Sequence, residues 1–160
     1  MWVFEFFHVI IGILWIGLLY FFNLVQVQSM PKMVEAGAAK PYTQIILPKA
    51  LFLFRHAALW TVITGILYFK FGHGTVDGIG FPPAPGAREL MWGMTFGIIM
   101  AANVWFIIWP NQKKIIAGEL EGDALNKAKR MAFLASRTNA WLSIPMLIGM
   151  ISANHGGIMF

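Results

Sequence analysis

The stretch that decides the fold is residues 2–23, WVFEFFHVIIGILWIGLLYFFN, in which Glu5 is the only acidic residue and Lys and Arg are absent. A helix needs about 20 mainly apolar residues to cross a membrane, because each residue adds about 1.5 Å of length. The stretch also lacks the basic start and the small-residue cleavage site of a secretory signal peptide. We therefore predict a transmembrane helix that the protein retains.

Three further stretches satisfy the same requirement, at residues 51–69, 90–109 and 133–154. A segment rich in proline and glycine, FPPAPG at residues 81–86, separates the second and third stretches and cannot be helical. Four helices whose connections alternate between two sides predict one all-α domain over residues 1–160, an integral membrane four-helix up-down bundle.

Two residues mark helix boundaries near the third and fourth spans. Proline has no backbone N–H and clashes with the preceding turn, so Pro110 is expected to end the third helix. Aspartate is a favoured helix cap, so Asp123 is expected to begin a helix that runs into the fourth span.

The composition excludes several classes of protein. Of the 160 residues, 58% are hydrophobic and only 12% are charged, whereas soluble domains carry roughly 25% charged residues. The sequence contains no cysteine, which excludes disulfide scaffolds, iron–sulfur clusters, thiolate zinc sites and covalently attached c-type haem. It also has no P-loop, no Gly-x-Ser-x-Gly elbow and no His-Glu-x-x-His helix. These exclusions leave a membrane protein without a familiar catalytic motif.

The cations are distributed unevenly and predict the orientation. Ten of them lie in the first and third connections and the adjoining helix ends: Lys32, Lys40, Lys49, Arg55, Lys113, Lys114, Lys127, Lys129, Arg130 and Arg137. The other side has only Lys70 and Arg88. Because positive residues stay in the cytoplasm, we expect both termini on the periplasmic side of a bacterial inner membrane. The cations then need no nucleic-acid partner.

Three of the four histidines are expected at one level. His8 lies about six residues into the first span, His73 follows the second span and His155 ends the fourth, so all three approach the periplasmic boundary. His56 lies alone near the cytoplasmic start of the second span. Ionisable groups inside a bilayer are costly, so each is a candidate for function.

The spacing of His8, Gly12 and Trp15 places them on one helix stripe that faces the bundle. Gly12 leaves room for a flat ligand beside the histidine, whereas glycines at the same level elsewhere, such as Gly65 and Gly149, also suit close helix packing. Without thiolates, imidazoles on different helices can hold haem iron, copper or zinc. His8 and His155 are candidate axial ligands of a b-type haem.

Two other interpretations of the histidines stay open. His8, His73 and His155 together could supply three ligands to a copper or zinc ion at the periplasmic face. Alternatively, they are interfacial histidines bonded to the backbone or to lipid headgroups.

The cytoplasmic half carries a second group of polar side chains: Asn23, Gln26, Arg55, His56, Asn103, Asn111, Gln112, Arg137 and Asn139. They form either an interhelical hydrogen-bond network or a quinone pocket with His56 as proton carrier.

Several strings resemble a known family. Residues 8–17 (HVIIGILWIG) with 20–23 (YFFN), 60–65 (WTVITG) and 139–155 (NAWLSIPMLIGMISANH) are similar to helices of the bacterial membrane-bound urate hydroxylases. Residues 100–114, MAANVWFIIWPNQKK, closely resemble the family's MAANVFFxIxPNQ segment. The chain thus resembles the urate oxidase N-terminal membrane domain.

The resemblance implies a membrane scaffold in which His8 and His155 are the matched histidines. Members of the family have a longer polytopic domain followed by a cytochrome c domain, and they oxidise urate. The present sequence has no Cys-x-x-Cys-His motif, so it resembles a shortened form without that domain. A cytochrome c or other membrane redox subunits are then the expected partners.

We therefore expect a haem-b-binding electron-transfer protein, a subunit of a larger respiratory or redox complex. Three alternatives remain open at the level of the sequence: a cofactor-free structural accessory subunit, the periplasmic-face copper or zinc site, and an enzyme that oxidises urate or a related purine.

Overall fold

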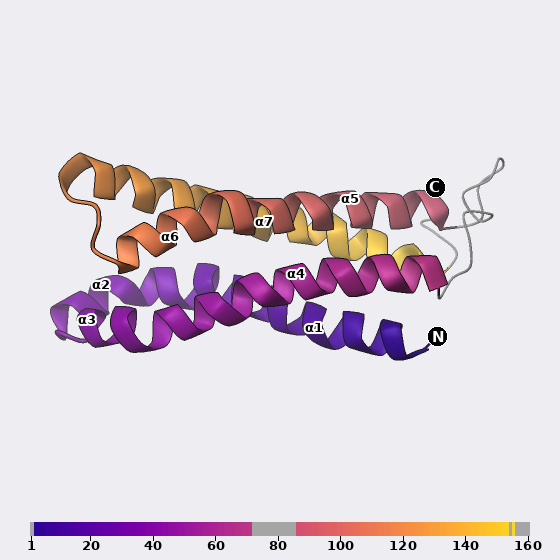
Figure 1. The fold of residues 1–160 in the computed structure, drawn as a ribbon, viewed down its shortest axis with the longest axis horizontal. Coiled ribbons are helices and arrows are strands. Elements are labelled where there is room, and N and C mark those ends of the chain that lie inside the picture. Colours follow the sequence, from indigo (N-terminus) through magenta and orange to yellow (C-terminus); the bar gives the residue numbers. More distant parts are fainter. Residues whose placement is uncertain (1, 72–85, 154, 156–160) are drawn as a thin grey trace.

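The computed structural model describes residues 2–71, 86–153 and 155, and this part is helical throughout apart from short turns. Adjoining helices stack end to end into four rods (Figure 1). The elements are α1 (Trp2–Tyr20), η1 (Phe21–Gln26), α2 (Val27–Glu35), α3 (Ala39–Pro41), η2 (Tyr42–Ile46), α4 (Leu47–Phe71), α5 (Ala87–Asn103), η4 (Val104–Ile108), α6 (Trp109–Ile116) and α7 (Gly122–Ala153), where η denotes a π-helix. The all-α prediction is confirmed.

Three rods, Trp2–Glu35, Ala39–Phe71 and Ala87–Ile116, are long and apolar enough to cross a membrane, which marks the chain as a membrane protein. The fourth rod, α7, is as long but more polar and is not among them. Its polar residues include Asn139 and Ser143, both completely buried inside the bundle. Exposed charged residues such as Arg130 and Arg137 also lower the apolarity of α7. Further along the helix, lipid would meet residues such as Trp141, which is 68% exposed.

The rods run up and down as predicted. The start of α1, the end of α4, the start of α5 and the end of α7 lie at one end of the bundle, called here the terminal end (Figure 1). The α2–α3 and α6–α7 turns lie at the opposite end, called the loop end. The side of the membrane that each end faces stays a prediction from the charges.

Glycine closes both turns at the loop end. Gly37, with φ of 69°, donates its N–H to Val34, and the next residue, Ala38, donates to Met33. The pattern recurs after α6, where Gly118 has φ of 68°. This is the Schellman arrangement, in which a left-handed residue satisfies the last carbonyls of a helix.

The helices extend well beyond the apolar stretches, and Pro110 does not end one. It lies in the first turn of α6, directly after the π-helical η4, and the rod continues to Ile116. A widened π turn removes the carbonyl clash that proline causes in a regular helix. Pro48 similarly follows η2. The helix expected near Asp123 is confirmed, but it begins at Gly122 and Asp123 lies inside its first turn.

The bundle consists of two close helix pairs, α1 with α4 and α5 with α7, and these pairs contact each other less extensively. Gly93 and Gly149 allow α5 and α7 to approach: a Cβ added to Gly149 would lie 2.8 Å from the Gly93 nitrogen. Small residues permit such backbone contact between membrane helices. Close packing is therefore the role of these two glycines.

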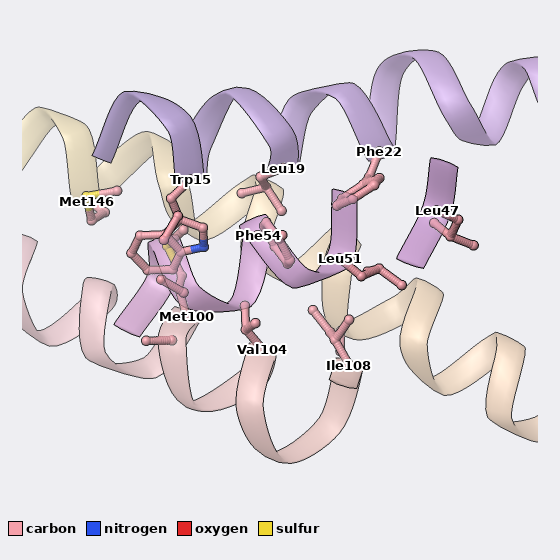
Figure 2. Packing of buried hydrophobic residues seen from close by; sticks show 14 of the residues in the cluster. Trp15, Leu19, Phe22, Leu47, Leu51, Phe54, Met100, Val104, Ile108 and Met146 are labelled. Atoms are coloured by element: carbon pink, nitrogen blue, oxygen red, sulfur yellow. The ribbon is translucent and has the colours of Figure 1, made fainter. Parts of the chain in front are cut away.

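Large apolar side chains fill the space where the two pairs meet. Figure 2 shows Trp15 and Phe54, from the first pair, directed toward Met100 and Val104 of the second. Each of these four side chains is at most 1% exposed. This core lies midway along the rods and fixes the direction in which the stripe on α1 faces.

Candidate functional site

His8 faces α4 and is held there by the backbone. Its Nδ1 lies 2.9 Å from the Thr61 carbonyl oxygen and 3.4 Å from the Thr64 hydroxyl. A carbonyl can only accept, so Nδ1 carries the proton and donates it. The Nε2 atom of the neutral ring then keeps its lone pair, which is the atom that could bind a metal.

Gly65 gives the His8 ring its place against α4. A Cβ added to Gly65 would lie 2.9 Å from His8 Cε1 and 3.1 Å from Nδ1. Any side chain at this position would therefore displace the imidazole. The glycine thus serves His8 itself, a role that its position in the sequence did not reveal.

Gly12 and Trp15 lie on the same stripe and also face the interior. A Cβ on Gly12 would meet Thr61 Cγ2 at 3.8 Å, so the space beside this glycine is bordered by α4. Trp15 is 1% exposed, and its indole Nε1 has no hydrogen-bond partner among the described residues. The predicted direction of the stripe is confirmed. Whether these residues border a cofactor stays a prediction.

His155 lies just beyond the end of α7 and is exposed. Its Nδ1 is 2.9 Å from the Ile151 carbonyl of its own helix, so this nitrogen is the donor of the hydrogen bond. The hydrogen bonds described for His8 lead to α4, and none leads to His155. The pairing of the two rings on one iron therefore stays a prediction.

One residue of the alternative three-histidine metal site, His73, lies outside the described residues. Within residues 2–71, 86–153 and 155, no group of three histidine or carboxylate side chains is arranged to hold a metal ion.

His56 is engaged with neighbouring aromatic residues. Its Nδ1 lies 2.7 Å from the Phe52 carbonyl, and its ring centroid is 4.1 Å from the Phe52 ring and 6.0 Å from the Trp105 ring. These contacts account for its half-buried position. They include no acidic partner that would relay a proton.

A polar network links the helix pairs through α7. Asn139 accepts a hydrogen bond from Asn103 Nδ2 at 2.9 Å and donates one to the Met100 carbonyl at 2.8 Å. One turn further along α7, Ser143 forms a hydrogen bond with Tyr20 of α1 at 2.9 Å. Asn23 donates to the Ser136 hydroxyl, also at 2.9 Å. The interhelical network expected for Asn23, Asn103 and Asn139 is confirmed.

Three members of this network, Tyr20, Ser136 and Ser143, were not predicted from the sequence. The signal was present: Ser136, Asn139 and Ser143 are spaced i, i+3 and i+7, which places them on one face of a helix.

The C-terminal half of the chain matches a known family. Residues 84–160 match the family model described as urate oxidase N-terminal. The match includes α5, α6, α7 and His155, whereas His8 precedes it. No curated protein and no solved structure is matched by the chain. Residues 84–160 are therefore similar to the urate oxidase N-terminal family, in agreement with the resemblance of the MAANVWFIIWPNQKK segment.

Proposed function

We propose that this chain is a helical membrane subunit of a redox assembly, in which His8 binds the iron of a b-type haem and electrons pass to a partner such as a cytochrome c. The observation that supports it best is the 2.9 Å hydrogen bond from His8 Nδ1 to the Thr61 carbonyl. Histidines that bind metals almost always donate their other ring N–H to such an acceptor, which orients the ring and raises its basicity.

The donor chemistry of His8 fits one axial position of haem iron. The His8 ring belongs to an apolar helix, and Gly65 leaves space for the imidazole beside α4. Because Nδ1 donates to the Thr61 carbonyl, Nε2 of the neutral ring keeps its lone pair. Once bound, a haem would supply reversible one-electron transfer. His155 is the proposed second ligand, because its Nδ1 is likewise bonded to a carbonyl. Gly12 and Trp15 would border the macrocycle.

The remaining residues have positioning roles in this proposal. The Thr61 carbonyl fixes the tautomer and the direction of the His8 ring, and the Thr64 hydroxyl lies 3.4 Å from the same nitrogen. Thr64 donates its own proton to the Trp60 carbonyl at 2.6 Å, so its oxygen remains directed toward the histidine. The His8 ring can therefore bind iron while it keeps its hydrogen-bond partners on α4.

His8→Ala is expected to abolish haem binding, because it removes the imidazole that α1 directs toward α4. The measurement is the pyridine haemochrome content of the full chain purified in detergent, with optical spectra before and after dithionite. His56→Ala is the matched control, since that ring lies among Phe52 and Trp105 and should leave the haem content unchanged. Wild-type protein without haem, or equal haem in His8→Ala, would refute the proposal.

A cofactor-free accessory subunit is the second candidate. The observation that favours it is the polar network, in which Asn139 and Ser143 are completely buried and hydrogen-bonded to other helices. Such a closed interior suits a subunit whose outer faces serve assembly. It predicts unchanged spectra in His8→Ala and stoichiometric co-purification with a larger complex.

Oxidation of urate is the activity that the matched family's description suggests. Because the match covers residues 84–160, this chain would act as one part of such an oxidase. A turnover assay with urate and an electron acceptor separates this possibility from electron transfer alone.

Elemental analysis for copper and zinc of the same preparation tests the three-histidine alternative.

A further inference from the structure

Arg55 is a charged side chain within an apolar rod. It lies in α4, and the Ala39–Phe71 rod to which α4 belongs is apolar enough to cross a membrane. Its guanidinium carbon lies 3.7 Å from the Trp109 ring centroid and 5.5 Å from that of Phe52. No carboxylate among the described residues pairs with it, and its other contacts are with His56 and Trp105.

An unpaired guanidinium in an apolar rod has an unfavourable desolvation free energy. Charges inside a membrane are normally paired or reach the interface, and contact with an aromatic ring offsets only part of the desolvation. Arg55 is half-buried between two rings, so its free N–H groups still require an acceptor. An anion that comes from outside the chain would satisfy them.

Two shallow grooves with almost entirely apolar walls include aromatic rings that Arg55 contacts. The first, of about 450 Å³, is lined by Pro48, Lys49, Phe52 and Leu53. The second, of about 230 Å³, is lined by Pro48, Trp109, Lys113, Ile116 and Ala117. Phe52 belongs to the first groove and Trp109 to the second, so the guanidinium contacts one aromatic ring of each groove. Each groove also has a lysine on its wall.

The three cations lie at the level of a lipid headgroup. Lys49 lies two residues before the apolar stretch 51–69, and Lys113 lies four residues after the stretch 90–109, so both are expected at the boundary near the loop end. Arg55 lies about one turn deeper, within reach of that boundary. Trp109 is an aromatic residue of the kind enriched at membrane interfaces.

No carboxylate among the described residues lines either groove. Glu119 and Glu121 are exposed in the turn beyond Ala117, and neither lines a groove. Phe52 and Leu53 are 51% and 46% exposed. Apolar side chains thus continue from the cationic level toward the centre of the rods. A ligand with an anionic head and an apolar tail matches both features.

We propose that this face binds an anionic phospholipid of the surrounding bilayer, with its phosphate on Arg55, Lys49 and Lys113 and an acyl chain on Phe52 and Leu53. Basic sites between membrane helices hold such headgroups, and the cytoplasmic leaflet, which the charges assign to the loop end, is the anionic one. The proposal does not depend on haem binding.

The test uses the full chain in lipid vesicles and the quenching of its tryptophan fluorescence, because Trp109 lines the site. Brominated phosphatidylglycerol should quench more than brominated phosphatidylcholine at equal mole fraction. Arg55→Gln and Lys113→Gln should each lower the apparent affinity for phosphatidylglycerol about fivefold, equivalent to about 1 kcal/mol per cation. Lys70→Gln removes a cation at the opposite end of α4 and should have no effect.

Lys113→Gln keeps the test valid if Arg55→Gln fails to fold, since Lys113 is exposed in α6. Equal quenching by the two lipids, or a preference that survives both substitutions, would overturn the proposal. Loss of the preference on addition of inorganic phosphate would assign the site to a free anion and overturn it as well. A face covered by a protein subunit would show no lipid preference.

Discussion

Gly149→Leu is expected to separate α5 from α7. A Cβ at position 149 would lie 2.8 Å from the Gly93 nitrogen, closer than real contacts allow, and its neighbour there is backbone, which cannot rotate away. The two helices would have to move apart and lose the contacts that Gly93 makes with Met146 and Met150. Overpacking of this kind costs about 3 kcal/mol.

The thermal unfolding of the detergent-purified variant measures this effect. Gly17→Leu is the matched control, because Gly17 lies in α1, is exposed and has no neighbour within 4 Å of an added Cβ. The control should unfold like the wild type, whereas Gly149→Leu should unfold at a much lower temperature. Equal unfolding of the two variants would show that the α5–α7 contact does not support the bundle.

Asn139→Leu is expected to cost about 2 kcal/mol of unfolding free energy, since it leaves the Asn103 amide and the Met100 carbonyl without the partner that both now have. Asn139 is completely buried, so water cannot replace the lost groups. The substitution keeps the branched shape and the number of heavy atoms of the side chain, so it removes the hydrogen bonds without creating a cavity.

A double-mutant cycle between Asn103→Ala and Asn139→Ala isolates their shared hydrogen bond. We expect a coupling energy of about 1 kcal/mol, near the upper part of the range for hydrogen bonds between membrane helices. Asn111→Leu serves as the control, because the hydrogen bond that Asn111 makes among the described residues is to the Ile107 carbonyl of its own rod. Additive effects of the two substitutions would contradict an interhelical role for the pair.

The apolar stretches predicted the number of rods and their up-down order because the bilayer demands a minimum length of apolar sequence. They did not predict where the helices end. The π turn before Pro110 allows this proline to lie inside a rod. In α2, the first rod continues as a helix through polar residues that lie beyond the apolar stretch. Hydropathy therefore predicts where the chain leaves the lipid, whereas Gly37 and Gly118 determine where α2 and α6 end.

The candidate site was predicted only in part, since a single helix shows which face turns inward but not which helix it meets. The stripe from His8 to Trp15 faces the interior as its spacing indicated. The Thr61 carbonyl and Gly65, which hold the imidazole, belong to α4 and become neighbours only in the folded bundle. The stacking of Arg55 on Trp109 joins α4 to α6 and could not be predicted for the same reason.

The most direct test of His8 as an iron ligand is a redox titration of haem in the His8→Met variant. Methionine keeps an axial donor but stabilises the reduced iron, so the account predicts retained haem with a midpoint potential higher than that of the wild type. A haem whose potential and spectrum are the same in both proteins would show that the iron is bound elsewhere.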